Sequence, residues 1–99
     1  SEQNNHFQPK FRLFNWPNPF NSETTICFYL DKYQNIELSI YNVLGQKIRT
    51  LVNTTMGAGR HLASWDGKNN LGMQVASGIY FFKIMAGDYV KSHKMMFLK

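Results

Sequence analysis

The chain has few of the side chains on which enzymes and metal sites depend. Its 99 residues include six acids, three histidines and a single cysteine. Cys27 lies between Ile26 and Phe28, has no partner for an internal disulfide, and is typical of an inert strand residue. No converging carboxylates and no pairing of a nucleophile with a base can be recognised. We therefore expect a domain without catalytic activity and without a cofactor.

The richest candidate for a metal site is the run Asp66, Asn69 and Asn70, with Asp88 further along the chain. Calcium prefers six or more oxygen ligands, usually with several carboxylates among them. The run itself offers one carboxylate, and the three histidines are too scattered to suggest zinc. A turn in which Asp66 accepts hydrogen bonds from nearby backbone amides explains the run without a metal. We expect no metal here.

Long apolar runs are also missing. No run of 18 apolar residues occurs, so the sequence predicts no membrane-spanning helix. Residues 1–10 are polar, include Pro9 and lack the apolar region of a signal peptide, so we interpret them as a linker. The remaining residues, 11–99, are long enough for one domain.

The charge balance is positive, with a net charge of +5. Such a balance allows contact with an acidic surface or an anionic polysaccharide. No dense basic motif of a nucleic-acid-binding protein is present, so we expect no nucleic-acid partner. Four late lysines, Lys83, Lys91, Lys94 and Lys99, are interpreted as one solvated face.

Alternation of apolar and polar residues dominates the chain, and no helical periodicity persists. The turns are marked by Gly45, by Asp66 with Gly67, and by Gly87. Short strands with regular turns predict an all-β fold, an immunoglobulin-like antiparallel β-sandwich of about seven strands whose last two are neighbours. The expected strands are residues 11–14, 24–30, 36–40, 48–51, 61–65, 78–84 and 89–98.

The same alternation predicts which side chains face the core. Glu37, Ser39, Arg49 and Lys94 are expected to face solvent. The expected core residues are Ile26, Phe28, Leu38, Ile40, Trp65, Tyr80, Phe82 and Ile84, with Met95 and Phe97 also pointing inward.

Five short segments follow one another in a fixed order. They are Trp16-Pro17-Asn18-Pro19-Phe20-Asn21, Tyr41-Asn42-Val43-Leu44-Gly45-Gln46, Trp65-Asp66-Gly67, Ala76-Ser77-Gly78-Ile79-Tyr80-Phe81, and a late pattern of Gly87 with Lys94. Together they resemble the type A C-terminal sorting domain of proteins exported by the bacterial type IX secretion system. That domain is similar to the immunoglobulin-like domain of flagellar hook-capping proteins. The chain departs from the pattern at Glu23, near which a proline is usual.

The resemblance implies a non-catalytic sorting signal that directs an upstream cargo domain across the outer membrane. The implied partners are the outer-membrane translocon, its shuttle and a surface peptidase. The implied location is the periplasm in transit, then the cell surface or the medium. The residues implied in recognition are Gly78, Tyr80, Gly87, Lys91, Lys94 and Lys99. Those implied in the structural motifs are Pro17, Asn18, Pro19, Phe20, Gly45, Trp65, Asp66 and Gly67.

A sorting tag of this kind needs an exposed edge, and a final strand that ends the chain would offer unpaired amides and carbonyls to a receptor. The alternative is a carbohydrate-binding or structural accessory module of a multidomain secreted hydrolase. Trp16 and three tyrosines, Tyr29, Tyr33 and Tyr41, are the candidates for a sugar-binding platform, whereas Trp65 is expected in the core. A chain that ends on its last strand favours the sorting tag over a spacer.

Overall fold

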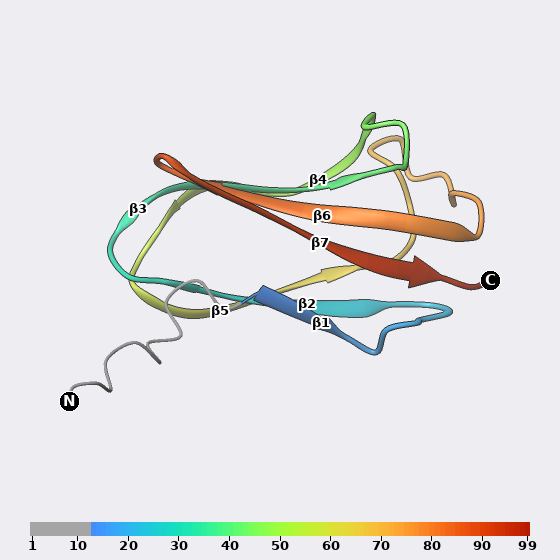
Figure 1. Cartoon of the computed structure of the whole chain (residues 1–99), viewed down its shortest axis with the longest axis horizontal. Coiled ribbons are helices and arrows are strands. Elements are labelled where there is room, and N and C mark those ends of the chain that lie inside the picture. The colour runs from blue at the N-terminus through green and yellow to red at the C-terminus, as the bar shows by residue number, and fades with distance from the viewer. Residues whose placement is uncertain (1–12) are drawn as a thin grey trace.

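The computed structural model describes residues 13–99, which fold into seven β-strands in two layers (Figure 1). Within this range there is no helix of the length and apolarity needed to cross a membrane. The strands are β1 (Leu13–Trp16), β2 (Thr24–Leu30), β3 (Gln34–Tyr41), β4 (Lys47–Met56), β5 (Gly59–Trp65), β6 (Gly78–Ala86) and β7 (Tyr89–Phe97).

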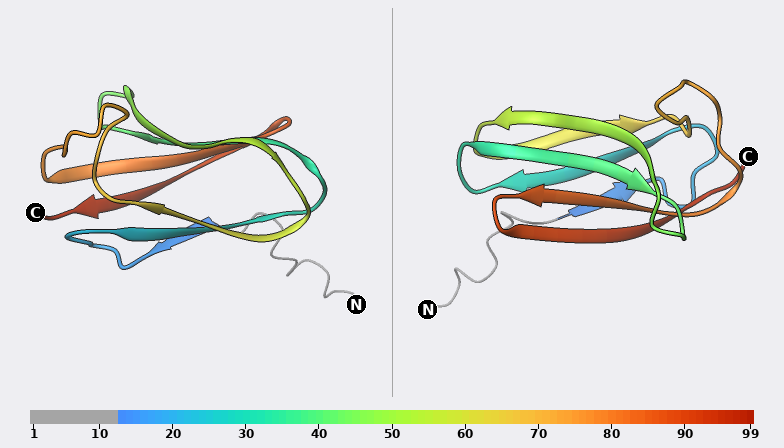
Figure 2. Two further views of the ribbon diagram at one scale, coloured as in Figure 1. Left: turned by 180° about the vertical axis from the view of Figure 1, so that it is seen from behind. Right: turned by 90° about the horizontal axis from the view of Figure 1, so that it is seen from above.

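The strands form two antiparallel sheets that pack face to face (Figure 2). One sheet has three strands in the order β1-β2-β5, and the other has four in the order β4-β3-β6-β7. The last two strands pair along their whole length, from Gly78 opposite Phe97 to Ala86 opposite Tyr89. The predicted immunoglobulin-like β-sandwich and its final hairpin are therefore confirmed.

Alternation explains how each sheet supplies one apolar face. On β6, Tyr80, Phe82 and Ile84 are buried, while the residues between them are partly exposed. β2 and β3 repeat this pattern, because β-branched and aromatic residues pack well on a pleated, half-buried surface. Every residue predicted for the core is buried, and Met95 and Phe97 also point inward.

Ser39 is an exception to the simple alternation. It was expected to face solvent with Glu37, but its side chain is completely buried. It lies on the outer side of β3 between Thr50 of β4 and Lys83 of β6, and its hydroxyl donates to the Glu37 carboxylate at 2.7 Å. A residue on a central strand is covered by its neighbours even when it faces away from the core, so the prediction for Ser39 is wrong.

The first strand differs from its predicted bounds. β1 begins at Leu13 in the described range and continues through Trp16, one residue before Pro17. The predicted linker, residues 1–10, and the predicted start of the first strand at Phe11 lie outside the described residues. Trp16 is 47% exposed and stacks on Phe14, so it lies on the outer face of the sandwich.

Truncation of Phe82 tests the core. Its side chain is completely buried in the middle of β6, so Phe82→Ala is expected to lower the free energy of unfolding by about 3–5 kcal/mol. Urea titration followed by tryptophan fluorescence measures this loss. A loss below about 1 kcal/mol would contradict the packing described here.

Candidate functional site

The C-terminal end of β7 is the point at which two of the five sequence segments, those that contain Phe20 and Trp65, meet the last strand. Phe97 is completely buried there, and its ring stacks on Phe20 with the centroids 4.9 Å apart. The Trp65 ring lies 6.0 Å from Phe97 and meets Phe20 edge to face at 5.6 Å. The first and third sequence segments thus contact the last strand directly, although they are far from it in the chain.

The backbone of the segment between β1 and β2 also holds β7. The Phe20 amide donates to the Met96 carbonyl at 3.0 Å, and the Leu98 amide donates to the Phe20 carbonyl at 2.8 Å. The Asn18 side chain adds to this short parallel pairing, because its Oδ1 accepts from the Met96 amide at 3.0 Å. Its Nδ2 also lies 3.4 Å from the Lys94 carbonyl. In Figure 1 this segment and the end of β7 lie on the same side of the molecule.

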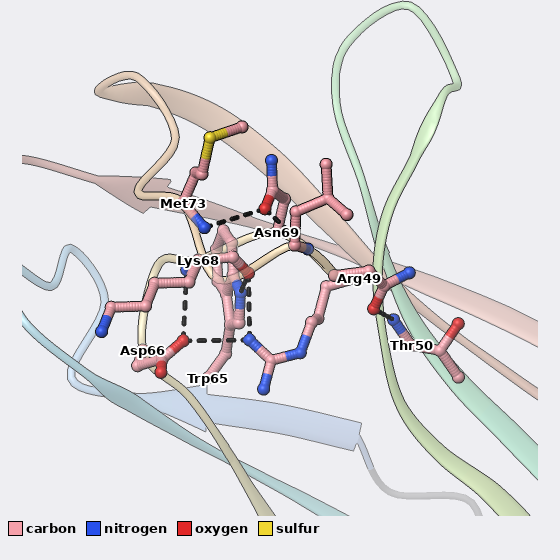
Figure 3. Close-up of polar contacts among 9 residues, drawn as sticks. Arg49, Thr50, Trp65, Asp66, Lys68, Asn69 and Met73 are labelled. Atoms are coloured by element: carbon pink, nitrogen blue, oxygen red, sulfur yellow. Dashed lines mark hydrogen bonds and ion pairs between the residues drawn. The ribbon is translucent and has the colours of Figure 1, made fainter.

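The loop after β5 approaches this cluster at Gly67, and its polar contacts are shown in Figure 3. The indole Nε1 of Trp65 donates to the Lys68 carbonyl at 2.9 Å. Asp66 Oδ1 accepts from the Lys68 amide at 3.1 Å, which is the backbone-capping turn that the sequence predicted. Arg49 donates to Asp66 Oδ1 at 3.1 Å and to the Lys68 carbonyl at 3.0 Å. Arg49 therefore binds the loop, while its side chain stays 29% exposed.

Asp66 is held ionised by these contacts. Partial burial opposes its ionisation, but the hydrogen bond from the Lys68 amide and the guanidinium of Arg49 together lower the pKa of the Asp66 carboxyl below its usual value. The charged carboxylate thus ties β4 to the loop after β5.

The other oxygens of the candidate metal run have backbone partners. Asn69 Oδ1 accepts from the amides of Leu71 at 2.9 Å and Met73 at 3.0 Å, and Asn70 Oδ1 accepts from the Thr50 amide at 3.1 Å. Within residues 13–99 no three His, Cys, Asp or Glu side chains are grouped so that they could hold a metal ion. The side chains of this loop shape its backbone.

The residues implied in recognition do not form one cluster. Gly87 lies in the turn of the β6–β7 hairpin, and Gly78 lies at the opposite end of β6. The nine residues of β7 separate these ends by roughly 25–30 Å. Tyr80 is buried, meets Trp65 edge to face, and its hydroxyl donates to the Ala76 carbonyl at 2.7 Å, while burial raises the pKa of the Tyr80 hydroxyl. Tyr80 therefore supports the fold.

The late lysines do not share one face. Lys94 pairs with Phe81, which points outward, whereas Lys91 pairs with Ile84, which points to the core. Lys91 and Lys94 are exposed on opposite sides of β7. The Lys99 amide donates to Ser77 Oγ at 2.9 Å beyond the end of the strand. The interpretation of the lysines as one solvated face is wrong, because alternation separates positions that differ by an odd number.

The outer edge of β7 is only partly open. Its C-terminal half pairs with Asn18 and Phe20, which occupy the amides of Met96 and Leu98. β7 is the edge strand that the sequence predicted, but its unpaired amides and carbonyls are available only where Asn18 and Phe20 do not bind. The local sequence of β7 does not predict this contact, because Asn18 and Met96 are 78 positions apart in the chain.

The aromatic residues considered for a sugar-binding platform are dispersed. Trp16 and Tyr29 lie on the outer side of the three-stranded sheet, and Tyr41 lies on the outer side of the four-stranded sheet. Tyr33 lies in the turn between β2 and β3 and is 75% exposed. Trp65 is buried, as predicted. These side chains do not form a single plane.

The two sheets and their topology define the class of the protein as an immunoglobulin-like β-sandwich. The family of the FlgD Ig-like domain matches residues 20–89, and the chain belongs to this family. No curated protein sequence matches the chain.

Similar folds occur in several solved structures. Dimeric latent PorU from Porphyromonas gingivalis superposes with a TM-score of 0.71 at 15% sequence identity. PorZ, a surface component of the type IX secretion system of Porphyromonas gingivalis, superposes with a TM-score of 0.62 at 19% sequence identity. The matches cover 87% and 89% of this chain but only 9% and 12% of those proteins. The DNA glycosylase AlkC of Pseudomonas fluorescens superposes with a TM-score of 0.54 at 11% sequence identity. This match covers 90% of this chain and 30% of AlkC. At these identities the likeness shows the fold alone.

Gly67 provides a test of the cluster around Phe97. Its φ is +76°, and a Cβ atom would lie 2.7 Å from Cζ of the buried Phe97 ring. Gly72 has a similar φ of +82° but no atom within 4 Å of such a Cβ. At either site, alanine should lower the free energy of unfolding by about 1–2 kcal/mol, because its Cβ disfavours the positive φ. At Gly67 the clash of this Cβ with the Phe97 ring should lower it by about 1–3 kcal/mol more. Equal losses of unfolding free energy for Gly67→Ala and Gly72→Ala in urea would show that the ring moves aside.

Glu37 provides a pH test on the outer side of the four-stranded sheet. The hydrogen bond from Lys47 at 2.6 Å, with a second from Ser39, lowers the pKa of the Glu37 carboxyl. A lowered folded-state pKa contributes stability above the unfolded pKa, and this contribution is lost as the pH falls through the folded pKa. Glu37→Gln should therefore be less stable than the parent at neutral pH, and the difference should vanish in acid. Urea titrations across the acid range measure it, with the exposed Glu23→Gln as the matched control; a constant difference would contradict the assignment.

Proposed function

We propose that this domain is a non-catalytic sorting signal that directs an attached cargo domain across the outer membrane by the type IX secretion system. The observation that carries the proposal is the order of the five sequence segments, together with the packing of the first and third of them on the last strand. Phe20, Trp65 and Gly67 surround Phe97 at the end of β7. The first and third segments thus pack on the end of the last strand, and the fourth reaches the same cluster through the contact of Tyr80 with Trp65.

Two further points support the proposal. The chain belongs to the FlgD Ig-like family, whose domain is similar to that of type IX sorting domains. Its fold also resembles parts of PorU and of PorZ, the latter a surface component of that secretion system. The proposed partners are the outer-membrane translocon with its shuttle and a surface peptidase, and the proposed route leads through the periplasm to the cell surface or the medium.

The structure changes which part of β7 can test this function. Deletion of residues 95–99 would remove Met95 and Phe97 from the core, so it would unfold the domain as well as remove a signal. Substitution of an exposed residue can remove a recognition signal without unfolding the domain. Lys94 is exposed and forms no ion pair within the described residues, so its side chain is available to a receptor.

Export of a reporter fused to residues 1–99 tests the proposal in a host with an intact type IX system. We expect the fusion to reach the cell surface or the medium, and to stay in the periplasm of a host without the translocon. Lys94→Ala should impair export while changing the free energy of unfolding by no more than about 0.5 kcal/mol. Lys32→Ala is the matched control, since Lys32 is also exposed but lies in the turn between β2 and β3. Periplasmic retention of the parent fusion in the intact host would refute the sorting function and favour an accessory module.

A further inference from the structure

The outer side of the four-stranded sheet carries apolar side chains at positions that are usually polar in antiparallel sheets. Ile79, Phe81 and Met85 of β6 alternate with the buried core residues and so point to this side. Val90 and Met96 of β7 pair with Met85 and Ile79, and they are 57% and 38% exposed. The apolar side chains thus lie toward both ends of this side, with Lys83 and Lys94 between them.

Two of the grooves on this side adjoin Phe81 and Lys94, which lie directly opposite each other on β6 and β7; the second of them reaches the edge of β7, where Asn18 and Pro19 also line it. The first has a volume of about 240 Å³ and the second about 220 Å³. The residues of interest are Tyr41, Phe81 and Lys83 in the first groove, and Ile79, Lys94 and Met96 in the second. Each groove therefore combines apolar walls with one lysine.

The charge of this surface is positive. Glu37 is the acid that β3 contributes to it, and Lys47 already pairs with that carboxylate at 2.6 Å. Lys83 lies over the Tyr41 ring, with Nζ 4.5 Å from the centroid. Within residues 13–99 neither Lys83 nor Lys94 forms a salt bridge. A partner that complements this surface is acidic.

The distance between Lys83 and Lys94 matches the distance between alternate side chains of an extended peptide. Lys94 is opposite Phe81, and Lys83 follows Phe81 by two residues, so the two lysines occupy diagonal positions about 7–8 Å apart. Acidic side chains at alternate positions of an extended peptide are about 7 Å apart. An apolar side chain two positions earlier in such a peptide would reach the groove between Ile79 and Met96, which are also directly opposite each other.

The two asparagine side chains that line these grooves, Asn18 and Asn42, already have hydrogen-bond partners within the domain. The Asn18 amide binds the backbone of β7. Asn42 binds Gln46 through Nδ2, and its Oδ1 accepts from the amides of Leu44 and Gln46 in its own turn. The edge of β7 is also partly closed by Phe20. The face, with its lysines and apolar walls, is therefore a better peptide site than the edge and a poor sugar site.

We propose that this face binds an extended acidic segment of a partner protein, with an apolar residue followed by acids at alternate positions. The identification of that partner with the export machinery rests on the function proposed above. The contact itself rests only on Lys83, Lys94 and the two grooves.

A peptide titration of the full chain tests the contact. The probe is an acetylated peptide Leu-Thr-Glu-Thr-Glu, and its control is Leu-Thr-Gln-Thr-Gln. We expect the acidic probe to shift the NMR amide signals of Phe81, Lys83 and Lys94, and the shifts to weaken with added salt. The double variant Lys83→Gln with Lys94→Gln should raise the dissociation constant by roughly fivefold to tenfold. The matched variant Lys32→Gln with Lys68→Gln should leave it unchanged.

Several results would overturn the inference. Equal shifts with the acidic and the glutamine peptides would remove the role of charge, and shifts confined to other surfaces would remove the site. Stronger binding of oligogalacturonate than of the acidic peptide would assign the face to an anionic polysaccharide. In the export assay, normal export of the Lys83→Gln, Lys94→Gln fusion would refute this surface as the export contact and leave the sorting function intact. Failure of the parent fusion would refute the sorting function, and the titration would then decide the peptide site alone.

Discussion

Burial of the Phe97 ring is the interaction on which the arrangement of the domain depends. The ring is completely buried between Phe20 and Trp65, and the absence of a side chain at Gly67 leaves space for it. A phenylalanine buried in this way contributes about 1.5–3 kcal/mol by removal from water alone. Phe97 lies opposite Gly78 at the end of the β6–β7 pairing, and the segment after β1 and the loop after β5 both contact its ring there. Three distant parts of the chain are thereby joined.

The last strand consequently has two sides with different roles. Met95 and Phe97 belong to the core, whereas Lys94 and Met96 face solvent beside Phe81 and Ile79. A signal read from this strand in the folded domain must therefore lie in its outward side chains. The inward positions can affect such a signal only through folding. Tyr80, which the family resemblance implied in recognition, lies on the inward side of the sheet and packs against Trp65.

The loops near this end keep their shape through local hydrogen bonds. Asp66, Asn42 and Asn69 each accept from the amide two residues ahead. Such turns compete well with regular structure, and they end strands where the chain must reverse. The ion pair between Arg49 and Asp66 then connects the loop after β5 to an edge of the other sheet. The outer side of that sheet is left with Lys83 and Lys94 as its unpaired cations within the described residues.

The sequence by itself determined the features that depend on local alternation. It predicted β2 with its observed bounds, the β6–β7 hairpin and every named core residue, because a period of two assigns side chains to faces without knowledge of the partner strand. It also predicted the turn at Asp66, since the side chain and the amide that it binds are two residues apart. The five family segments could be recognised as well, because each consists of residues that are close together in the sequence or at a fixed spacing.

Only the tertiary structure decided the features that depend on distant neighbours. Ser39 is buried because strands on both sides cover it, and Arg49 is bound because the loop at Asp66 folds back to it. The edge of β7 is closed by Asn18, 78 positions away from Met96. The surface around Phe81 and Lys94 likewise exists only when β6 and β7 pair in register. Such contacts leave no local pattern, because each of their halves is an ordinary turn or strand residue until the chain has folded.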